Sequence, residues 1–255
     1  MPYAEVPGAQ LWYEDTGGDG TPLVLVHANI GNSQSWAETV PVFSQAAYRV
    51  IRFDLRSHGR SKAPGRESQG TIAGDLGALL HELAVGPCCL VGTAYGAFGC
   101  IEYALDHPDR LRALVISTSF GGLTDPQFTA ERAKHIDPEL PNWPEERREL
   151  GGTYRKGNPE GVKRFLAIDE QNPDHPAKRQ SLGQPTTLTR LEAMKVPTLV
   201  IAADEDAYAP PPVMRMFADH IPGAQFQVIA GSGHSAYWEQ PEAWNEAVLT
   251  FLAGK

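Results

Sequence analysis

Cysteine, basic residues and long apolar runs are all scarce in this chain, and each scarcity excludes a class of protein. The three cysteines, Cys88, Cys89 and Cys100, are too few and too unevenly spaced for a disulfide framework or a zinc site. We therefore interpret them as small core residues and expect no bound metal. No run approaches the roughly 18 consecutive apolar residues that span a bilayer, and the first residues lack a secretion-signal pattern. We expect a cytoplasmic protein that does not enter a membrane.

Basic residues are outnumbered, with 22 Lys and Arg against 31 Asp and Glu and a net charge of -9. No Lys/Arg-rich patch is present that could neutralise phosphates, so nucleic acid is not an expected partner. A hydrophobic content of 42% with 21% charged residues is ordinary for a soluble globular protein. The length of 255 residues fits one α/β domain with an insertion.

Short apolar runs alternate with amphipathic segments along most of the chain. Strands are predicted over 10–14, 23–26, 49–53, 88–91, 111–116, 198–202 and 225–229, and helices over 36–43, 71–83, 96–105, 212–220 and 242–252. Uninterrupted apolar strands joined through helices indicate a mostly parallel sheet covered on both faces. The alternation fails over 120–191, a proline-rich excursion with a short helical patch at 161–168, which we interpret as a helical lid. The core is then 1–119 and 192–255.

A sharp turn is predicted between the strand ending near Val91 and the helix beginning at Gly96. Gly92 and Gly96 match the two glycines of the nucleophile-elbow pattern G-x-S-x-G, which a tight strand-to-helix turn requires. The central residue is Ala94, where the pattern has the attacking side chain. A methyl group cannot act as a nucleophile, so the turn has the two glycines of the motif but lacks the attacking side chain.

Two further polar loops follow predicted strands at the edge of the sheet where ligands bind. Asp204, Glu205 and Asp206 follow one strand, and His234 follows the last strand within Gly231-Ser232-Gly233-His234. The resulting order of nucleophile, acid and base is the order used by α/β-hydrolases. A weak oxygen nucleophile needs a base to take its proton, and the imidazole needs a carboxylate to orient it and stabilise its charge.

The sequence resembles the α/β-hydrolase superfamily over nearly its whole length, and within it the 3-oxoadipate enol-lactonase-like and cofactor-free haloperoxidase-like serine esterases. The matching pieces, in chain order, are 26–31, 53–61, 92–96, 203–206 and 231–234, the last followed by Glu239-Gln240-Pro241. The resemblance implies an α/β-hydrolase fold: a mostly parallel sheet flanked by helices, with a helical lid inserted after the sixth strand. It also implies that no cofactor is used.

Residue by residue, the resemblance makes Ala94 the nucleophile position, where serine is expected, Asp206 the acid and His234 the base. The backbone N–H groups of Asn29 and Tyr95 would form the oxyanion hole. The chain departs from the family pattern where alanine or serine replaces glycine, at Ala28, Ser57, Ala97 and Ala203.

Three histories could place alanine at position 94. The first is replacement of a serine, which silences turnover and leaves the binding site intact. The second is replacement of an aspartate, as found in dehalogenase or epoxide-hydrolase relatives, but those sites usually have Trp after the nucleophile and Pro in the oxyanion loop, whereas this chain has Tyr95 and no proline in 27–33. The third is a natural alanine in a protein that binds a ligand or uses His234 as a general base for isomerisation, elimination or oxygenation.

The sequence therefore predicts a serine-type hydrolase of a small-molecule carboxylic ester or lactone, present as a form inactivated at Ala94. Hydrolysis of a C–C bond uses the same triad and stays an alternative, as do non-hydrolytic chemistry and ligand sensing. Five aromatic residues are candidates either for the substrate pocket or for core and lid packing: Trp36, Phe120, Phe128, Trp143 and Tyr237. The oligomeric state is left open.

Overall fold

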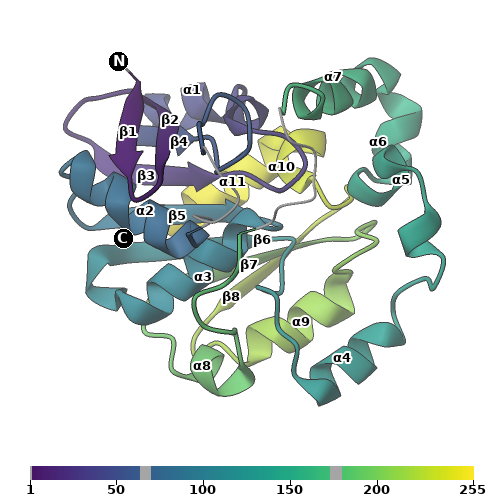
Figure 1. The fold of residues 1–255 in the computed structure, drawn as a ribbon. Coiled ribbons are helices and arrows are strands. Elements are labelled where there is room, and N and C mark those ends of the chain that lie inside the picture. The colour runs from purple at the N-terminus through teal and green to yellow at the C-terminus, as the bar shows by residue number, and fades with distance from the viewer. Residues whose placement is uncertain (1, 64–69, 173–179) are drawn as a thin grey trace.

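An eight-stranded sheet forms the centre of the computed structural model, which describes residues 2–63, 70–172 and 180–255 (Figure 1). The strands are β1 (Tyr3–Val6), β2 (Ala9–Asp15), β3 (Thr21–Val26), β4 (Tyr48–Phe53), β5 (Cys88–Thr93), β6 (Leu111–Ser117), β7 (Thr198–Ala203) and β8 (Gln225–Ile229). They lie in the order β1-β2-β4-β3-β5-β6-β7-β8. Pairing is antiparallel for β1 with β2 and for β2 with β4, and parallel between all neighbours from β4 to β8.

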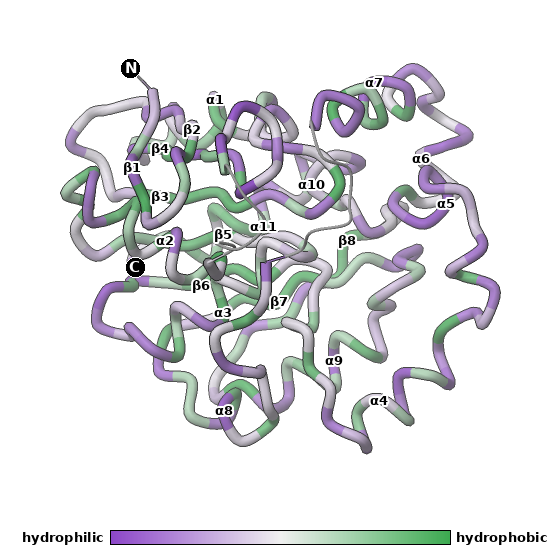
Figure 2. The backbone as a smooth tube through the Cα atoms, viewed as in Figure 1, coloured by the Kyte–Doolittle hydropathy of each residue, from purple (hydrophilic) through white to green (hydrophobic). Residues whose placement is uncertain are grey.

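Successive residues of the apolar strands point into two different cores, which explains why the runs are continuous rather than alternating. Val24 and Leu90 pack on one face of the sheet, whereas Leu25 and Val91 pack on the other. Helices α2 (Ile72–Glu82), α3 (Gly96–Asp106) and α9 (Pro211–Asp219) cover the first face, and α1 (Thr39–Gln45) and α11 (Pro241–Leu252) cover the second. Figure 2 shows the hydrophobic colouring concentrated along the central strands.

The segment between β6 and β7 carries five helices among the described residues, and they lie to the right of and below the sheet in Figure 1. They are α4 (Pro126–Ala133), α5 (Glu145–Glu149), α6 (Gly152–Gly157), α7 (Pro159–Asp169) and α8 (Leu188–Glu192). Leu150, Tyr154 and Phe165 form a small hydrophobic cluster of their own within this segment. Helix α10 (Ala236–Glu239) follows β8.

The predicted fold class is confirmed, and one local prediction needs correction. The helix expected over 36–43 is instead a 3-10 helix, Ser33–Trp36, followed by α1 from Thr39. The short strand β1 was not expected, and β8, which was expected as a strand, is a largely exposed edge strand. Within the described ranges, no helix combines the length and apolar character needed to cross a membrane.

Candidate active site

A strained turn joins β5 to α3 and has Ala94 at its apex. Ala94 has a φ of 46°, in the left-handed region that residues with a Cβ rarely adopt. A Cβ on Gly92 would lie 2.6 Å from the Ala97 Cα, and a Cβ on Gly96 would lie 2.3 Å from the His27 carbonyl oxygen. The backbone can therefore make this turn only with glycine on both sides of Ala94, which is why the sequence pattern located it.

His234 and Asp206 form a hydrogen-bonded pair beside this turn. Nδ1 of His234 lies 3.0 Å from each carboxylate oxygen of Asp206. Oδ1 of the buried Asp206 also accepts the backbone N–H groups of Tyr208 at 2.8 Å and Ala209 at 3.1 Å, which fixes the orientation of the carboxylate. Because Nδ1–H donates its hydrogen bond to the carboxylate, Nε2 is the ring nitrogen left to act on a substrate.

The three acidic residues that follow β7 have three different partners. Asp204 accepts the N–H of Gly231 at 2.7 Å, and Glu205 accepts the N–H of Thr153 at 2.8 Å. Asp206 is the one that faces His234. The structure thus brings together the acid and base predicted from the sequence, while the two neighbouring carboxylates tie adjacent loops together.

The carboxylates around His234 favour its charged form. Burial disfavours the imidazolium, but the nearby carboxylates of Asp206, Glu149 and Glu239 outweigh that penalty and raise the pKa of His234 to about 9. At neutral pH the ring is therefore a cation that carries a proton on Nε2. It becomes available as a base only as the pH approaches 9.

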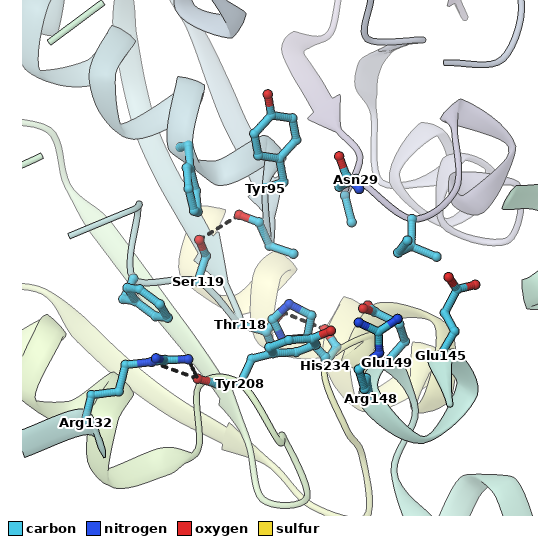
Figure 3. A pocket seen from close by; sticks show the side chains of 15 residues that line it. Asn29, Tyr95, Thr118, Ser119, Arg132, Glu145, Arg148, Glu149, Tyr208 and His234 are labelled. Carbon is cyan, nitrogen blue, oxygen red and sulfur yellow. Dashed lines mark hydrogen bonds between the residues drawn. The ribbon is translucent and has the colours of Figure 1, made fainter. Parts of the chain in front are cut away.

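A pocket of about 260 Å³ opens between the Ala94 turn, His234 and the segment that follows β6 (Figure 3). This volume is slightly below the usual range of about 300 to 1,000 Å³ for ligand pockets, so it suits a small molecule. The residues that line it are Ala28, Asn29, Ile30, Ala94, Tyr95, Phe98, Thr118, Ser119, Phe120, Arg132, Glu145, Arg148, Glu149, Tyr208 and His234.

Of the five aromatic candidates, Phe120 lines this pocket and the other four do not. Phe128 is buried behind it, with ring centroids 5.7 Å apart. Trp36 and Tyr237 are fully buried against each other in the core between the sheet and α11, with centroids 4.4 Å apart, so of the two predicted alternatives they belong to the core packing and not to the pocket. Trp143 instead packs under the guanidinium group of Arg147.

Asn29 and Tyr95, the predicted oxyanion-hole residues, both line the pocket near Ala94 (Figure 3). Tyr95 stands at the N-terminus of α3, where backbone N–H groups have no acceptor within the helix. The loop that carries Asn29 is held by His58, whose Nε2 lies 3.0 Å from the Asn29 carbonyl oxygen, and by a 2.8 Å hydrogen bond from the Gly31 N–H to Asp169. Their role as oxyanion donors stays a prediction.

Several polar pocket residues had no signal in the sequence: Arg132, Glu145, Arg148, Glu149 and Tyr208. The first four lie on α4 and α5, far along the chain from the triad positions, and no motif marks them. The Tyr208 ring packs 4.6 Å from the ring of His234, and the Arg132 guanidinium group donates to the Tyr208 carbonyl oxygen at 3.0 Å. The charged side chains of the pocket wall therefore come from α4 and α5, and only the tertiary structure shows that these helices lie beside the pocket.

The cysteines are buried and free of disulfide bonds, as expected of core residues. Burial raises the pKa of Cys88 to about 12 and that of Cys89 to about 11, so neither forms a thiolate at neutral pH. Across the part of the chain that the structure describes, no three or more His, Cys, Asp or Glu side chains are grouped so that they could hold a metal ion.

Glu239 ties the His234 loop to the segment between β6 and β7. Its buried carboxylate accepts backbone N–H groups from Gly151 at 2.7 Å, Gly233 at 2.9 Å and Ser235 at 3.3 Å. Burial raises the pKa of Glu239 to about 7, although these donors oppose the shift. The carboxylate is therefore largely ionised at pH 8, where all three N–H groups need an acceptor.

The Glu239→Gln variant is expected to lose about 1 to 3 kcal/mol of unfolding free energy at pH 8, because an amide NH₂ would face backbone donors. Urea unfolding measures this loss. Glu246→Gln, on the exposed side of α11, is the matched control and is expected to leave stability unchanged. Equal stability of the two variants would show that Glu239 does not anchor the loop.

Comparison with known proteins agrees with the geometry. A model of the alpha/beta hydrolase family matches residues 23–247. BpoC of Mycobacterium tuberculosis, a protein named as a non-heme bromoperoxidase, is 30% identical over 256 residues, covering 95% of this chain and 97% of that protein. A 2-hydroxy-6-oxononadienedioate/2-hydroxy-6-oxononatrienedioate hydrolase of Burkholderia vietnamiensis is 29% identical, covering 95% of this chain and 91% of the relative.

Solved structures give the same result. A thermophilic esterase from Thermogutta terrifontis superimposes with a TM-score of 0.80 at 27% identity, covering 99% of this chain and 97% of the esterase. The strained turn, the Asp206–His234 pair and these matches together establish that this chain belongs to the α/β-hydrolase family.

Proposed function

We propose that this pocket is the active site of a serine-type hydrolase of small-molecule carboxylic esters or lactones, with Ala94 standing in the nucleophile position. The observation that carries the proposal is the shared pocket of the Asp206–His234 pair and the strained Ala94 turn. A left-handed non-glycine residue costs free energy. A turn that must present a side chain to the neighbouring imidazole would explain why this strained conformation is kept.

With serine at position 94, the chemistry would follow the acyl-enzyme route. The serine Oγ would attack the ester carbonyl while Nε2 of His234 takes its proton, and Asp206 would stabilise the resulting imidazolium. Backbone N–H groups of Asn29 and Tyr95 would stabilise the oxyanion. His234 would then protonate the leaving alcohol, and water would release the acid.

Neither Thr118 nor Ser119, the serine and threonine among the described residues that line the pocket, is placed to replace the missing nucleophile. Oγ1 of Thr118 donates to the His234 carbonyl oxygen at 2.8 Å, and Oγ of Ser119 donates to the Ala94 carbonyl oxygen at 2.7 Å. Both hydroxyls are thus directed at the backbone rather than at Nε2. We therefore expect the Ala94 protein to form no acyl-enzyme.

The relatives support an acyl-transfer or C–C bond hydrolase without choosing between them. One is named an esterase and another a hydrolase of 2-hydroxy-6-oxononadienedioate, and C–C hydrolysis would use the same triad. We also propose that residues 120–191, of which 173–179 lie outside the described residues, act as the lid of the site. Arg132 on α4 and Glu149 on α5 support this role because they form part of the pocket wall.

The experiment that tests the proposal is the Ala94→Ser substitution, assayed against short p-nitrophenyl esters and a panel of lactones. Restored hydrolysis that again disappears on His234→Ala is the expected result. Absence of hydrolysis from a folded Ala94→Ser protein on every ester and lactone would refute it.

Hydrolysis by the Ala94→Ser variant is expected to rise with pH through the neutral range, to reach half of its maximum at about pH 9 and to level off above that. The reason is that the base must be neutral, and the surrounding carboxylates hold the pKa of His234 at about 9. The pH profile of kcat/KM measures this, and a profile of the Ala94→Ser protein that declines above pH 7 would contradict the assignment.

Asp206→Asn in the Ala94→Ser background should shift the rise of this profile to lower pH while lowering the rate. The reason is that it removes the main charge that favours the imidazolium.

A further inference from the structure

A second carboxyl group, that of Glu149, lies in the same pocket as His234 and neither takes nor gives a proton in the acyl-transfer route. Glu149 is the last residue of α5 and is 5% exposed. It lines the pocket together with Ala94 and Asn29 (Figure 3). Its main-chain carbonyl oxygen accepts the Ser235 N–H at 3.0 Å, so the backbone of Glu149 is fixed to the loop that carries His234.

The surroundings of Glu149 make its carboxylate more basic than one in water. Burial raises its pKa, and the charge of His234 and a hydrogen bond from Tyr208 only partly oppose this. A buried carboxylate that lines a pocket beside a proton-donating group is the arrangement with which enzymes remove protons from carbon next to a carbonyl. The adjacent imidazolium supplies the proton donor.

We propose that the Ala94 protein catalyses proton transfer at the carbon next to the carbonyl group of a small ketone or oxo acid, with Glu149 as the base and His234 as the acid. Ala94 offers no hydroxyl, so the Nε2 proton of His234 is free to serve the substrate. This activity goes beyond ester hydrolysis. It shares His234 and the proposed oxyanion donors with ester hydrolysis, but it uses Glu149 in place of a serine.

The step balances without any further reagent. A Glu149 carboxylate oxygen takes the proton, and the electron pair of the broken C–H bond forms the C=C bond of an enolate. Negative charge moves to the carbonyl oxygen, where the N–H groups of Asn29 and Tyr95 donate. His234 gives its Nε2 proton to that oxygen to form the enol, and the reverse step returns a proton to carbon.

The two arginines of the pocket wall favour an oxo acid over a neutral ketone. Arg132 and Arg148 both line the pocket, and Nε of Arg148 is buried with no hydrogen-bond partner among the described residues. A carboxylate on the substrate would satisfy such a donor. A charged and an uncharged probe therefore belong in the same experiment.

The test is deuterium exchange followed by proton NMR. The Ala94 protein is incubated in D₂O at neutral pH with 2-oxobutanoate or cyclopentanone, and loss of the signal of the hydrogens next to the carbonyl is timed. We expect faster exchange than in protein-free buffer for at least one probe, and a drop of about 100-fold on Glu149→Gln, the size typical of general-base loss. Glu146→Gln, on the same helix but outside the residues that line the pocket, is the matched control and should retain exchange.

Separate experiments can refute the proton-transfer proposal and the serine-hydrolase proposal. No acceleration with either probe, or equal exchange by the Glu149→Gln protein, would overturn proton transfer by Glu149. Hydrolysis by Ala94→Ser tests the serine-hydrolase proposal independently, because it requires the serine and His234 and does not use Glu149 as a base.

The direction of the pH dependence also separates the two activities. Exchange needs the His234 imidazolium, so it should fall as the pH rises through about 9, whereas serine-dependent hydrolysis should rise. The groups around His234 that set this value are the carboxylates of Asp206, Glu149 and Glu239, with the Tyr208 ring packed against the imidazole and Arg132 close to Asp206. Exchange that increases above pH 9 would contradict the assignment of His234 as the acid.

Discussion

The Ala94→Ser variant is expected to hydrolyse a p-nitrophenyl ester at least about 1,000-fold faster than the Ala94 protein. Loss of a serine nucleophile from an assembled triad costs about 10⁶-fold in kcat, while the oxyanion hole and binding contacts retain only a residual rate. The remainder of the triad is already in place here, because the Asp206–His234 hydrogen bonds are formed at 3.0 Å. A small side chain at position 94 is tolerated, so serine should fit without rebuilding the turn.

The control for this gain is His234→Ala in the Ala94→Ser background. It should return the rate to that of the Ala94 protein, since a triad acts as a unit and its members are not additive. If the double variant hydrolyses as fast as Ala94→Ser alone, serine would be acting without His234 and the proposed triad would be wrong.

Gly96→Ala is expected to lower the free energy of unfolding by at least about 3 kcal/mol, or to prevent folding. The added Cβ would lie 2.3 Å from the His27 carbonyl oxygen and 2.7 Å from the Val26 carbonyl oxygen. Both clashes are with backbone of β3 or its end, which cannot move without disturbing the centre of the sheet. For a protein of this size the loss corresponds to a fall of about 6 to 12 °C in Tm.

Gly86→Ala is the matched control, because a Cβ at Gly86 meets nothing within 4 Å. Thermal unfolding of the two variants should therefore differ sharply. A Gly96→Ala protein as stable as Gly86→Ala would mean that the turn can relax, and that glycine there is not required by close backbone approach.

The parts of the site that the sequence predicted are those encoded by local rules. Gly92 and Gly96 mark a turn with no room for side chains, so the position of Ala94 followed from the chain alone. Asp206 and His234 follow consecutive parallel strands, β7 and β8, and such strand ends meet at one edge of the sheet. The fold class followed from the same alternation of apolar runs and amphipathic helices.

The parts that the sequence could not predict depend on contacts between distant segments. Glu149 reaches the pocket because the Ser235 N–H binds its carbonyl oxygen and Glu239 holds the following loop, and neither contact has a sequence signature. The aromatic candidates show the same limit. Trp36 and Tyr237 have the residue types of a pocket wall, but a 4.4 Å ring contact places them in the core.

Covalent labelling of the Ala94→Ser protein with a fluorophosphonate tests the central claim most directly. Attack by a serine at position 94 would displace fluoride and leave a phosphonyl group on that residue, which peptide mass spectrometry locates. We predict modification at position 94 alone, abolished by His234→Ala and absent from the Ala94 protein. No label at position 94, or a label on Ser119 in both the Ala94 and the Ala94→Ser proteins, would contradict the assignment of Ala94 as the nucleophile position.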